Sequence, residues 1–457
     1  MDIINIALIG AGRAGRFHLN SLNNTRLFNL KYIVDLDLSK AIELSNDYHA
    51  NQESVKVITD INIPLQDKSI KAIIIASGTQ THYTLTKICL NNHKHVFCEK
   101  PLGNNEEEIK ECYKIAKNNN LKLFIGYQKR FDTNYNSIYQ QIINTNGKIK
   151  NIKSFTRDYP LPPFEYLKTS NGIVEDMISH DIDIINKYIG FKEPKKVVAF
   201  YYTHDEKLKE INEIEDIEIL MKYEDGLLVS INGSRKCDYG YCQRMEVSFN
   251  NKQIKFENKK NSDLTILDKS GQKTSQINES FKERYQEAYS KELEYFYKLI
   301  TDKEMELEVK EYDLLLLKKI TKAINLSIEE NRIVYLDSLR NGLRKYIKGS
   351  PQYEFYVEQH KNQTYETVCK SIKKYSMLGR KKMKMKEALL LMDNFVDPSD
   401  PDVDLPNSVH AYQTAERIRK KHPLNYELQI TGLIHDLGKI LFEFGEPNWN
   451  VVGDTFA

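Results

Sequence analysis

The sequence predicts three successive regions: an α/β domain at residues 1–125, an α+β domain at 126–337 and an all-α region at 338–457. Three observations support this division. Short β-branched runs alternate with helical patterns in the first region, strand patterns follow one another in the second, and helical patterns dominate the third. A chain of 457 residues is long enough for two or three domains with apolar cores of their own.

The first region predicts a parallel sheet that helices cover on both faces, because strands and helices alternate along the chain. The expected strands are 3–10, 29–36, 71–77, 95–99 and 122–127. The expected helices are 14–22, 39–48, 83–92 and 106–119.

The second region predicts a largely antiparallel sheet with a helix against one face. The expected helix is 174–189, and the expected strands are 196–203, 217–224, 227–234, 244–250 and 252–258. Two further helical stretches, 281–300 and 313–330, follow the strands.

The composition excludes several classes of protein. Lys and Arg number 66 and Asp and Glu 64, and this balance does not support a nucleic-acid-binding protein. The longest apolar runs have the length of a strand, so no membrane helix is expected. The amino-terminal stretch begins directly with a strand pattern, and the six cysteines form no C-x-x-C pair. We therefore expect a cytoplasmic protein with reduced thiols.

A glycine-rich loop, GAGRAG at residues 10–15, follows the first expected strand and precedes a helix. In such a loop Gly10 permits a tight turn, Gly12 lets the backbone approach a pyrophosphate, and Gly15 lets helix and strand pack closely. Asp35 closes the next strand, where a carboxylate accepts hydrogen bonds from a ribose and repels a 2′-phosphate. The pattern predicts a Rossmann domain that binds NAD in preference to NADP. The alternative is a glycine-rich turn in another doubly wound domain.

The stretch GIVEDMISHDIDIINKYIG carries a polar stripe opposite its apolar face. Asp176, His180 and Asp183 follow the spacing i, i+4, i+7. A solvated helix face is the simpler interpretation of three polar residues. An imidazole between two carboxylates, on a helix that starts after Gly172, instead suggests a general base that takes a proton from a hydroxyl.

Lys100 lies in the stretch CEKPLG, at the carboxyl end of an expected strand. A lysine before a proline is usually a solvated charge in a turn. Here the following proline favours an extended backbone at Lys100, and ligands bind at this edge of a doubly wound sheet. We therefore expect Lys100 to lie near the reacting oxygen and to help relay its proton.

Residues 1–337 resemble the Gfo/Idh/MocA oxidoreductases, and among them the inositol 2-dehydrogenases. The resemblance rests on the glycine loop with RAGRFH, on EKP, GYQKRFD and YGYCQRMEV, and on the Asp-x-x-x-His helix. It implies a Rossmann domain that binds NAD(P), a second domain with an open sheet that binds a cyclitol or sugar, and homo-oligomers formed through that sheet.

The resemblance also implies roles for individual residues. The implied catalytic group is Lys100, Asp176 and His180. The implied cofactor-binding residues are Gly10, Gly12, Arg13, Gly15, Asp35, Glu99 and Lys100, and the residues implied near the substrate are Arg130, Asp183 and Tyr241. The family usually begins the helix motif with Gly-Gly, whereas this chain has Asn171-Gly172, which bears on the packing at that corner and not on the proton chemistry.

The third region places His435 and Asp436 side by side on an apolar helix, after a helix that carries His410. Burying such groups is costly unless they bind something. Imidazole and carboxylate together suit iron, zinc or manganese. The alternative is a hydrogen-bonded core histidine beside a surface acid.

This region resembles the amino-terminal part of myo-inositol oxygenase, a diiron enzyme of the HD-domain class that converts inositol to glucuronate. DPDVDLPNSVHAYQTAE, GLIHDLGK and GEPNWNVVGDTF carry the resemblance. The implied metal ligands are His410, His435 and Asp436, the implied substrate contacts are Arg344, Asp397, Lys439, Gly453 and Asp454, and Tyr356 matches a lid residue.

The oxygenase family continues well beyond the position of Ala457 and supplies further ligands there. We therefore expect a truncated all-α HD-type domain whose metal site is incomplete, with a single weakly held ion as one outcome. The leading expectation is an NAD-dependent dehydrogenase that oxidises myo-inositol or a related polyol. An oxygenase activity of the carboxyl-terminal module, which we expect to form no glucuronate with residues 1–457 alone, and a regulator that binds NAD without chemistry are the alternatives.

Overall fold

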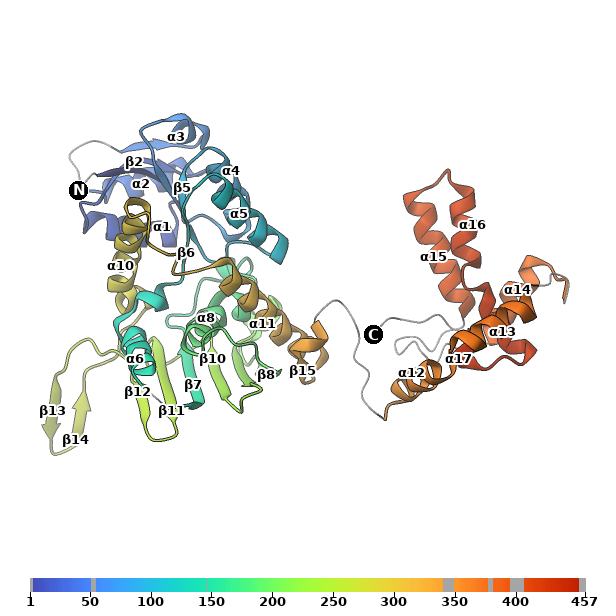
Figure 1. Ribbon diagram of the computed structural model, residues 1–457. Coiled ribbons are helices and arrows are strands. Elements are labelled where there is room, and N and C mark those ends of the chain that lie inside the picture. The colour runs from blue at the N-terminus through green and yellow to red at the C-terminus, as the bar shows by residue number, and fades with distance from the viewer. Residues whose placement is uncertain are drawn as a thin grey trace. The chain divides into compact units, whose positions relative to one another are not determined.

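The computed structural model describes residues 3–50, 55–145, 147–339, 349–376, 381–394 and 407–451 (Figure 1). The chain forms two compact units, residues 1–339 and 340–457. Each unit is described by itself below.

The first sheet of unit 1 is parallel, as the alternation of strands and helices predicted. Its order is β3-β2-β1-β4-β5-β6, the order of a Rossmann domain. The strands are β1 (Ile4–Ile9), β2 (Phe28–Val34), β3 (Lys56–Ile58), β4 (Ala72–Ile75), β5 (His95–Glu99) and β6 (Leu123–Gly126). The sequence patterns did not predict β3, which has only three residues and pairs with β2 at the edge of the sheet.

Helices connect these strands, and local sequence determines where several of them begin. The helices are α1 (Arg13–Asn23), α2 (Leu38–Asn46), α3 (Asn62–Gln66), α4 (His82–Asn91) and α5 (Glu106–Asn118). The Asp37 side chain accepts hydrogen bonds from two amides at the start of α2, and the Asn105 side chain accepts one from the Glu108 amide at the start of α5. Three glutamates in the first turn of α5 complement the helix dipole.

The second sheet of unit 1 has the order β12-β11-β7-β10-β9-β8-β15, and all its pairs are antiparallel except β7 with β10. The strands are β7 (Ile149–Arg157), β8 (Lys196–Tyr202), β9 (Asp216–Lys222), β10 (Leu228–Ser234), β11 (Cys242–Phe249), β12 (Gln253–Phe256) and β15 (Val334–Tyr335). The largely antiparallel sheet is confirmed, but the sequence patterns missed β7, which lies between β11 and β10. A separate hairpin consists of β13 (Thr265–Asp268) and β14 (Gly271–Thr274).

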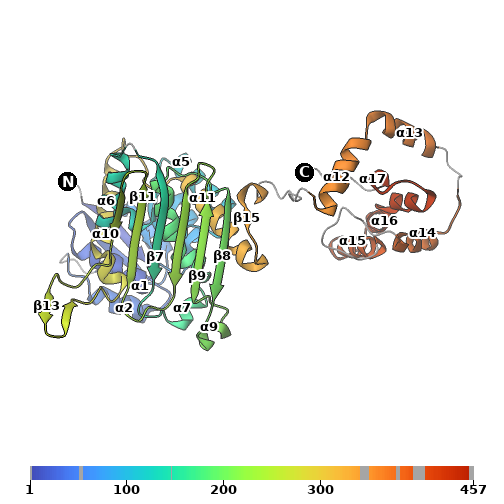
Figure 2. The ribbon, with the colours of Figure 1, turned by 90° about the horizontal axis from the view of Figure 1, so that it is seen from below.

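Helices cover one face of this second sheet and leave the other face open (Figure 2). The covering helices are α6 (Thr133–Ile143), α8 (Ser179–Tyr188) and α11 (Glu311–Glu330). On β9 the buried residues alternate with exposed ones such as Leu220, and the last three residues of β8, which include Phe200 and Tyr202, are exposed. Two short helices, α7 (Phe164–Leu167) and α9 (Glu206–Glu210), lie in the connections.

The helix α10 (Phe281–Thr301) follows strands β7 to β12 of the second sheet in the sequence but packs on the Rossmann domain. Leu293, Phe296 and Leu299 share an apolar core with residues of β1, β2 and β4. Phe296 lies against Phe28 and Phe97, with ring centroids 6.2 and 5.7 Å away. A helix that comes after residue 280 in the sequence therefore completes the apolar core of the Rossmann sheet.

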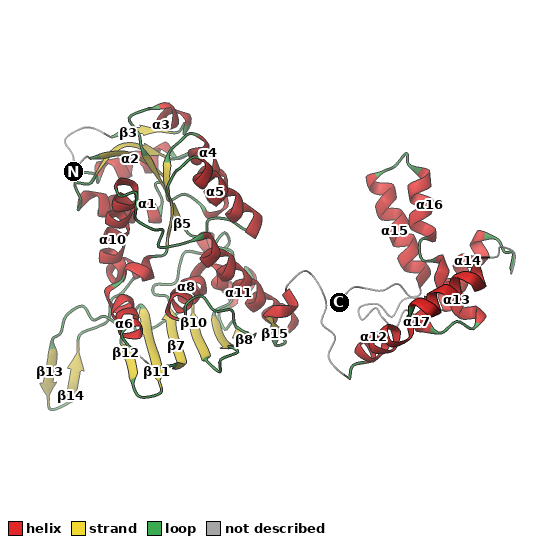
Figure 3. Ribbon diagram, viewed as in Figure 1, coloured by secondary structure: helices red, strands yellow, loops and turns green. Residues whose placement is uncertain are grey.

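All secondary structure that the structure describes in unit 2 is helical, with loops between the helices (Figure 3). Its helices are α12 (Pro351–Asn362), α13 (Tyr365–Tyr375), α14 (Met385–Leu391), α15 (Asn407–Lys421), α16 (Tyr426–Ile434) and α17 (Asn448–Val451). Its small apolar core consists of Leu389, Met392 and Ala411. Among the described residues of the whole chain, no helix has the length and apolar character needed to cross a membrane.

Candidate active site

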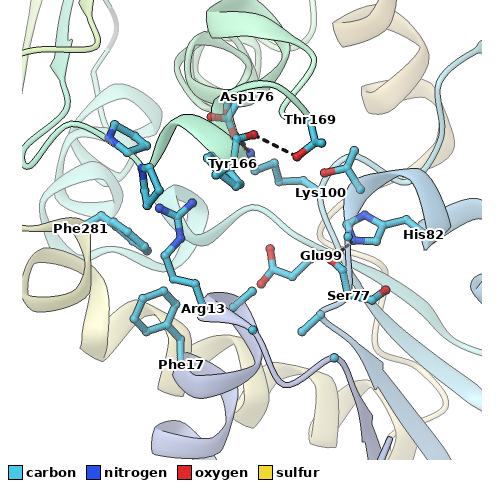
Figure 4. A pocket seen from close by; sticks show the side chains of 18 of the residues that line it. Arg13, Phe17, Ser77, His82, Glu99, Lys100, Tyr166, Thr169, Asp176 and Phe281 are labelled. Carbon is cyan, nitrogen blue, oxygen red and sulfur yellow. Dashed lines mark hydrogen bonds and ion pairs between the residues drawn. The ribbon is translucent and has the colours of Figure 1, made fainter. Parts of the chain in front are cut away.

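A cavity of about 880 Å³ opens at the carboxyl ends of the Rossmann strands in unit 1 (Figure 4). One wall comes from the loops after β1, β2, β4 and β5, and the other from the second domain. Ligands of doubly wound sheets bind at this edge.

The glycine loop has the close backbone approaches that its pattern predicted. Gly10 has a φ of +103°, and a Cβ there would lie 2.5 Å from the Ala76 carbonyl oxygen. A Cβ on Gly15 would lie 2.0 Å from the Gly10 carbonyl oxygen, so this glycine is required where α1 crosses the strand. Gly12 lines the cavity, precedes α1, and has no atom within 4 Å of the position of a Cβ. Its open side allows a ligand to reach the backbone.

Asp35 follows β2 and lines the same cavity. Its Oδ2 accepts a hydrogen bond of 2.6 Å from the Ala11 amide, and its Oδ1 accepts one of 2.8 Å from the Asp37 amide. A carboxylate has about four lone-pair sites, so these two bonds orient Asp35 and leave acceptor capacity for a hydroxyl. The loop and Asp35 thus fit the ribose and phosphates of a dinucleotide.

Glu99, at the end of β5, is oriented from behind by His18 of α1. The His18 Nε2 and Glu99 Oε1 atoms lie 2.7 Å apart. Burial opposes ionisation of Glu99, yet the hydrogen bond with His18 and the neighbouring positive charges hold the pKa of Glu99 below its ordinary value. Glu99 is therefore a carboxylate that lines the cavity beside Lys100.

Lys100 and Asp176 come together although they lie 76 positions apart in the sequence. The Lys100 Nζ donates to the Asp176 Oδ1 at 3.0 Å and to the Asp176 carbonyl oxygen at 2.6 Å. The Tyr166 hydroxyl donates to the same Oδ1 at 2.6 Å, and Arg235 donates to Oδ2 at 2.8 Å. Burial alone would raise the pKa of Asp176, but Lys100, Arg235 and Tyr166 together hold it far below its ordinary value.

Arg235 is a buried cation that three carboxylates share. It is 1 % exposed and contacts Asp158 at 3.2 Å, Asp176 at 2.8 Å and Glu213 at 2.8 Å. Burial raises the pKa of Asp158 and of Glu213, and the charge of Arg235 counteracts part of that rise. Arg235 and Asp158 line the cavity. The cavity therefore contains charged side chains beyond those of the polar stripe Asp176, His180 and Asp183 that the sequence indicated.

His180 lines the cavity, but the predicted arrangement of an imidazole between two carboxylates is wrong. Residues Val174–Ile178 form a π-helical turn, which changes the angular spacing between Asp176 and His180. Asp176 is bonded to Lys100, Tyr166 and Arg235 instead. The buried His180 Nδ1 has no hydrogen-bond partner among the described residues.

The charge state of His180 follows from its surroundings. Burial first, and then the positive charges of Lys100 and Lys129, lower the pKa of His180 well below its ordinary value, while Asp176 acts in the opposite direction. The imidazole is therefore neutral at neutral pH and able to accept a proton. The Tyr127 ring packs against it edge-on, with centroids 5.6 Å apart.

Arg130 and Asp183 need a correction, because neither lines the cavity. The Arg130 Nε and Nη2 atoms donate to the two Asp183 oxygens at 2.8 and 2.6 Å, and Arg130 also contacts Asp313 at 3.1 Å. Both side chains of this pair are at most 2 % exposed. Asp183, the last residue of the polar stripe, is thus buried, and the ion pair with Arg130 compensates its negative charge.

Other residues reach the cavity in their place. Tyr241, predicted near the substrate, does line it, and burial raises the pKa of its hydroxyl well above the ordinary value. Lys129, next to Arg130 in the sequence, also lines the cavity and lies 2.9 Å from Asp181. Sequence reasoning missed Asp158, Tyr166 and Arg235, since none of them belongs to a periodic pattern or to a motif with a defined spacing. It also missed Lys129, because within the motif GYQKRFD it chose the neighbouring Arg130.

In unit 2 the structure brings His410, His435 and Asp436 together. One ligand atom of each lies within 4.8 Å of the others. The His410 Nε2 lies 4.0 Å from Asp436 Oδ2, and the His435 Nε2 lies 3.6 Å from Asp436 Oδ1. The His435 Nδ1 hydrogen-bonds to the Gly432 carbonyl, which leaves Nε2 for a ligand. This donor set fits iron, zinc or manganese.

The remaining predicted residues of unit 2 are distributed as follows. Lys439 lies at the cluster, with its Nζ 3.0 Å from Asp436 Oδ2. Tyr356 is buried on α12. Arg344, Asp397, Gly453 and Asp454 lie outside the described residues.

Comparison with known proteins identifies unit 1. Residues 4–127 match the model of the oxidoreductase family with an NAD-binding Rossmann fold (GFO/IDH/MocA), and residues 143–255 match the carboxyl-terminal domain of the same family. The myo-inositol 2-dehydrogenase of Thermotoga maritima is 30% identical over 342 residues, which cover 74% of this chain and 99% of that protein. The chain belongs to the Gfo/Idh/MocA family of oxidoreductases.

Solved structures of inositol dehydrogenases have the fold of unit 1. The scyllo-inositol dehydrogenase of Lactobacillus casei with bound NAD(H) and scyllo-inositol has a TM-score of 0.68 at 26% identity, and covers 74% of this chain and 100% of that one. The myo-inositol 2-dehydrogenase of Lactobacillus plantarum has a TM-score of 0.67 at 27% identity, with 73% and 99% covered. The predicted Rossmann and open-sheet domains are confirmed by these matches.

Unit 2 matches a second family. Residues 351–457 match the model of myo-inositol oxygenase. The inositol oxygenase of Mus musculus is 46% identical over 120 residues, which are 26% of this chain and 42% of that protein. The chain thus spans less than half the length of this curated relative, and the predicted combination of the two families is confirmed.

Proposed function

We propose that the chain is an NAD-dependent dehydrogenase that oxidises one hydroxyl of a cyclitol or sugar, with myo-inositol to the 2-keto-inositol as its main reaction. The observation that carries the proposal is that the Lys100–Asp176 pair and the neutral His180 line the same cavity as the glycine loop. A base and a cation beside a dinucleotide site are what alcohol oxidation requires.

Different residues of the cavity serve the separate steps of this oxidation. When NAD is bound, it supplies the acceptor for the hydride that leaves the carbinol carbon. The neutral His180 takes the hydroxyl proton. The Lys100 ammonium group stabilises the negative charge that develops on the oxygen, and Asp176 fixes the position of that ammonium group. Glu99 and Asp35 are carboxylates that line the cavity and would accept hydrogen bonds from the ribose hydroxyls of the cofactor.

The choice of NAD over NADP follows from Asp35. Its carboxylate lines the cavity after β2 and is held by the Ala11 and Asp37 amides. A fixed negative charge at this position repels a 2′-phosphate.

The choice of a polyol follows from the wall opposite the glycine loop. Lys129, Asp158, Arg235 and Tyr241 line it, and together they offer donors and acceptors to several hydroxyls at once. The named relatives of both units act on inositols, which favours myo-inositol among polyols.

Formation of NADH, followed by its absorbance, tests the dehydrogenase. We expect turnover with myo-inositol or scyllo-inositol, less with glucose, and a lower rate with NADP than with NAD. Absence of NADH with all three polyols contradicts the proposal. NAD binding without any turnover would instead favour a regulator that senses the cofactor.

We further propose that unit 2 holds one metal ion, iron in first place, through His410, His435 and Asp436. Three protein ligands suffice for a single ion. Metal analysis after loading with iron is expected to give about one equivalent per chain, and none in His435→Ala. The exposed His422, which directly follows α15, provides a control, since His422→Ala leaves the three ligands in place. Glucuronate formed from myo-inositol, iron and oxygen would show that the chain also performs the oxygenase reaction.

The open face of the second sheet supports a homo-oligomer. Phe200, Tyr202, Leu220 and Leu228 are each at least 48 % exposed there. Uncovered aromatic and aliphatic side chains on one sheet face favour pairing with a second copy. Sedimentation analysis is expected to show a dimer or larger assembly, and Leu220→Lys is expected to dissociate it. We also propose a cytoplasmic location, in which the cysteines, all free in the structure, stay reduced.

A further inference from the structure

Tyr166 lies between the glycine loop and the Lys100–Asp176 pair. It belongs to the short helix α7, which follows a proline-rich stretch after β7. Its side chain lines the cavity, and Figure 4 shows it beside both Arg13 and Asp176. The two ends of the side chain have different partners.

The hydroxyl end contacts Asp176. It donates a hydrogen bond of 2.6 Å to Oδ1, the oxygen that also receives the Lys100 Nζ at 3.0 Å. Burial, Asp176 and the hydrogen bond between them raise the pKa of Tyr166, so its hydroxyl keeps its proton. A hydrogen bond to a charged group is among the stronger kinds in proteins. Tyr166 thus helps to fix the oxygen on which Lys100 is anchored.

The ring end contacts Arg13. The guanidinium carbon of Arg13 lies 4.2 Å from the centroid of the Tyr166 ring and 5.1 Å from that of Phe281, the first residue of α10. A cation over an aromatic face is attracted to it. Arg13 directly follows Gly12, so two aromatic rings from residues 126–337 hold a side chain of the glycine loop.

We propose that Tyr166 is a positioning residue with two separable functions: its ring holds Arg13 in place for the dinucleotide, and its hydroxyl holds Asp176 in place for Lys100. This inference rests on the proposed dehydrogenase function. It goes beyond that function because it links the cofactor loop to the proton-handling pair through one side chain. A rearrangement of Arg13 then alters the hydrogen bond on Asp176.

Two substitutions separate the functions. Tyr166→Phe removes the hydroxyl and keeps a ring over Arg13, whereas Tyr166→Leu removes both. Tyr83→Phe is the matched control, because the Tyr83 hydroxyl also donates to a carboxylate, that of Glu111, away from the cavity. Circular dichroism and thermal unfolding identify any variant that fails to fold. For each folded variant, calorimetry gives the Kd of NAD and NADH formation gives kcat and KM.

We expect Tyr166→Phe to lower kcat about tenfold, with the Kd of NAD unchanged. We expect Tyr166→Leu to show the same fall in kcat and in addition a Kd of NAD weaker by on the order of threefold. Tyr83→Phe is expected to match the wild type. Full kcat in Tyr166→Phe, or an unchanged Kd in Tyr166→Leu, overturns the proposal. So does an equal loss of NAD affinity in both variants, because the two functions would then not be separable.

The dehydrogenase proposal fails on a different result. If the wild type forms no NADH with any polyol, the function is wrong, but the NAD affinities of the two variants still test the ring. A crystal structure of Tyr166→Phe then tests the hydroxyl. The proposal expects the contact between Lys100 and Asp176 Oδ1 to lengthen beyond hydrogen-bond distance, and an unchanged 3.0 Å contact overturns it.

Discussion

Lys100 bonds twice to the same residue, once to the Asp176 carboxylate at 3.0 Å and once to the Asp176 carbonyl oxygen at 2.6 Å. The ammonium group therefore contacts both the side chain and the backbone of the π-helical turn that carries Asp176. A displacement of that turn moves Lys100 with it. The position of the ammonium group in the cavity is thus set by the second domain, although Lys100 itself belongs to the Rossmann domain.

Lys100→Met is expected to lower kcat by at least about 100-fold, because the developing oxyanion loses its cation. The Kd of NAD, measured by calorimetry, is expected to change little. Lys110→Met, which alters an exposed lysine paired with Glu106, serves as the control and should keep full activity. A collapse of NAD binding in Lys100→Met would make Lys100 a cofactor anchor and would remove its catalytic role.

The pH dependence of kcat is expected to reflect the lowered pKa of His180. Since the neutral imidazole is the base, kcat should stay constant through the neutral range and fall only at clearly acidic pH. His180→Gln is expected to lose roughly 10²- to 10⁴-fold in kcat and to lack this acid limb. His204→Gln, on the connection after β8, is the control. An acid limb centred near pH 6.5, the ordinary pKa of histidine, would show that His180 is not the base or is not buried.

Arg235→Met is expected to destabilise unit 1 by about 3–5 kcal/mol, because three carboxylates lose the buried cation that they share. Arg235→Lys retains the charge and is expected to lose less. Urea denaturation of the two variants and the wild type measures the difference. Equal stability of the Met and Lys variants would mean that the positive charge of Arg235 does not stabilise the three buried carboxylates.

The stability of unit 1 is expected to depend on pH through Glu292 of α10. This carboxyl is 0 % exposed, neither of its oxygens has a hydrogen-bond partner among the described residues, and burial and the charge of Glu99 raise its pKa well above the ordinary 4.5. A raised pKa in the folded state gives a contribution to stability that is complete below pH 4.5 and is lost as pH rises. Glu292→Gln removes this loss.

The unfolding temperature of Glu292→Gln should therefore exceed that of the wild type by an increasing margin as pH rises from acidic to alkaline. Glu294→Gln, exposed on the same helix, should show no such trend. A constant difference across the pH range would mean that Glu292 titrates as it does in the unfolded chain.

The sequence predicts much of the fold because period and spacing are local properties. Alternating strands and helices indicated the Rossmann sheet, and the roles of Gly10 and Gly15 in close packing followed from the loop pattern. Strand β7 was missed because only three of its nine residues, IKNIKSFTR, are apolar and polar residues separate them, so the apolar pattern is weak. The short edge strand β3 gave no signal either.

The site was harder to predict because it depends on contacts between distant residues. The sequence predicted roles for Lys100 and for Asp176, but it did not predict the hydrogen bond between them, because they lie 76 positions apart. Nothing in the stretch around Arg235 or Tyr166 indicates that both meet Asp176. The regular helix assumed for the whole polar stripe is a π-helical turn at Asp176, which changes the position of Asp176 relative to His180. Asp183 lies three residues after His180 on the regular helix α8, but it pairs with the buried Arg130, a partner that the stripe itself does not indicate.

The packing of α10 on the Rossmann sheet has a consequence for synthesis on the ribosome. A nascent chain that ends at Gly126 already contains all six strands of that sheet, yet Leu293 and Phe296, which complete its apolar core, have not been made. At a translation rate of roughly 5–20 residues per second, this face of the sheet stays uncovered for roughly 8–33 seconds. The Rossmann domain therefore finishes folding only after most of the second domain has emerged, and during that interval the growing chain is a natural client for chaperones.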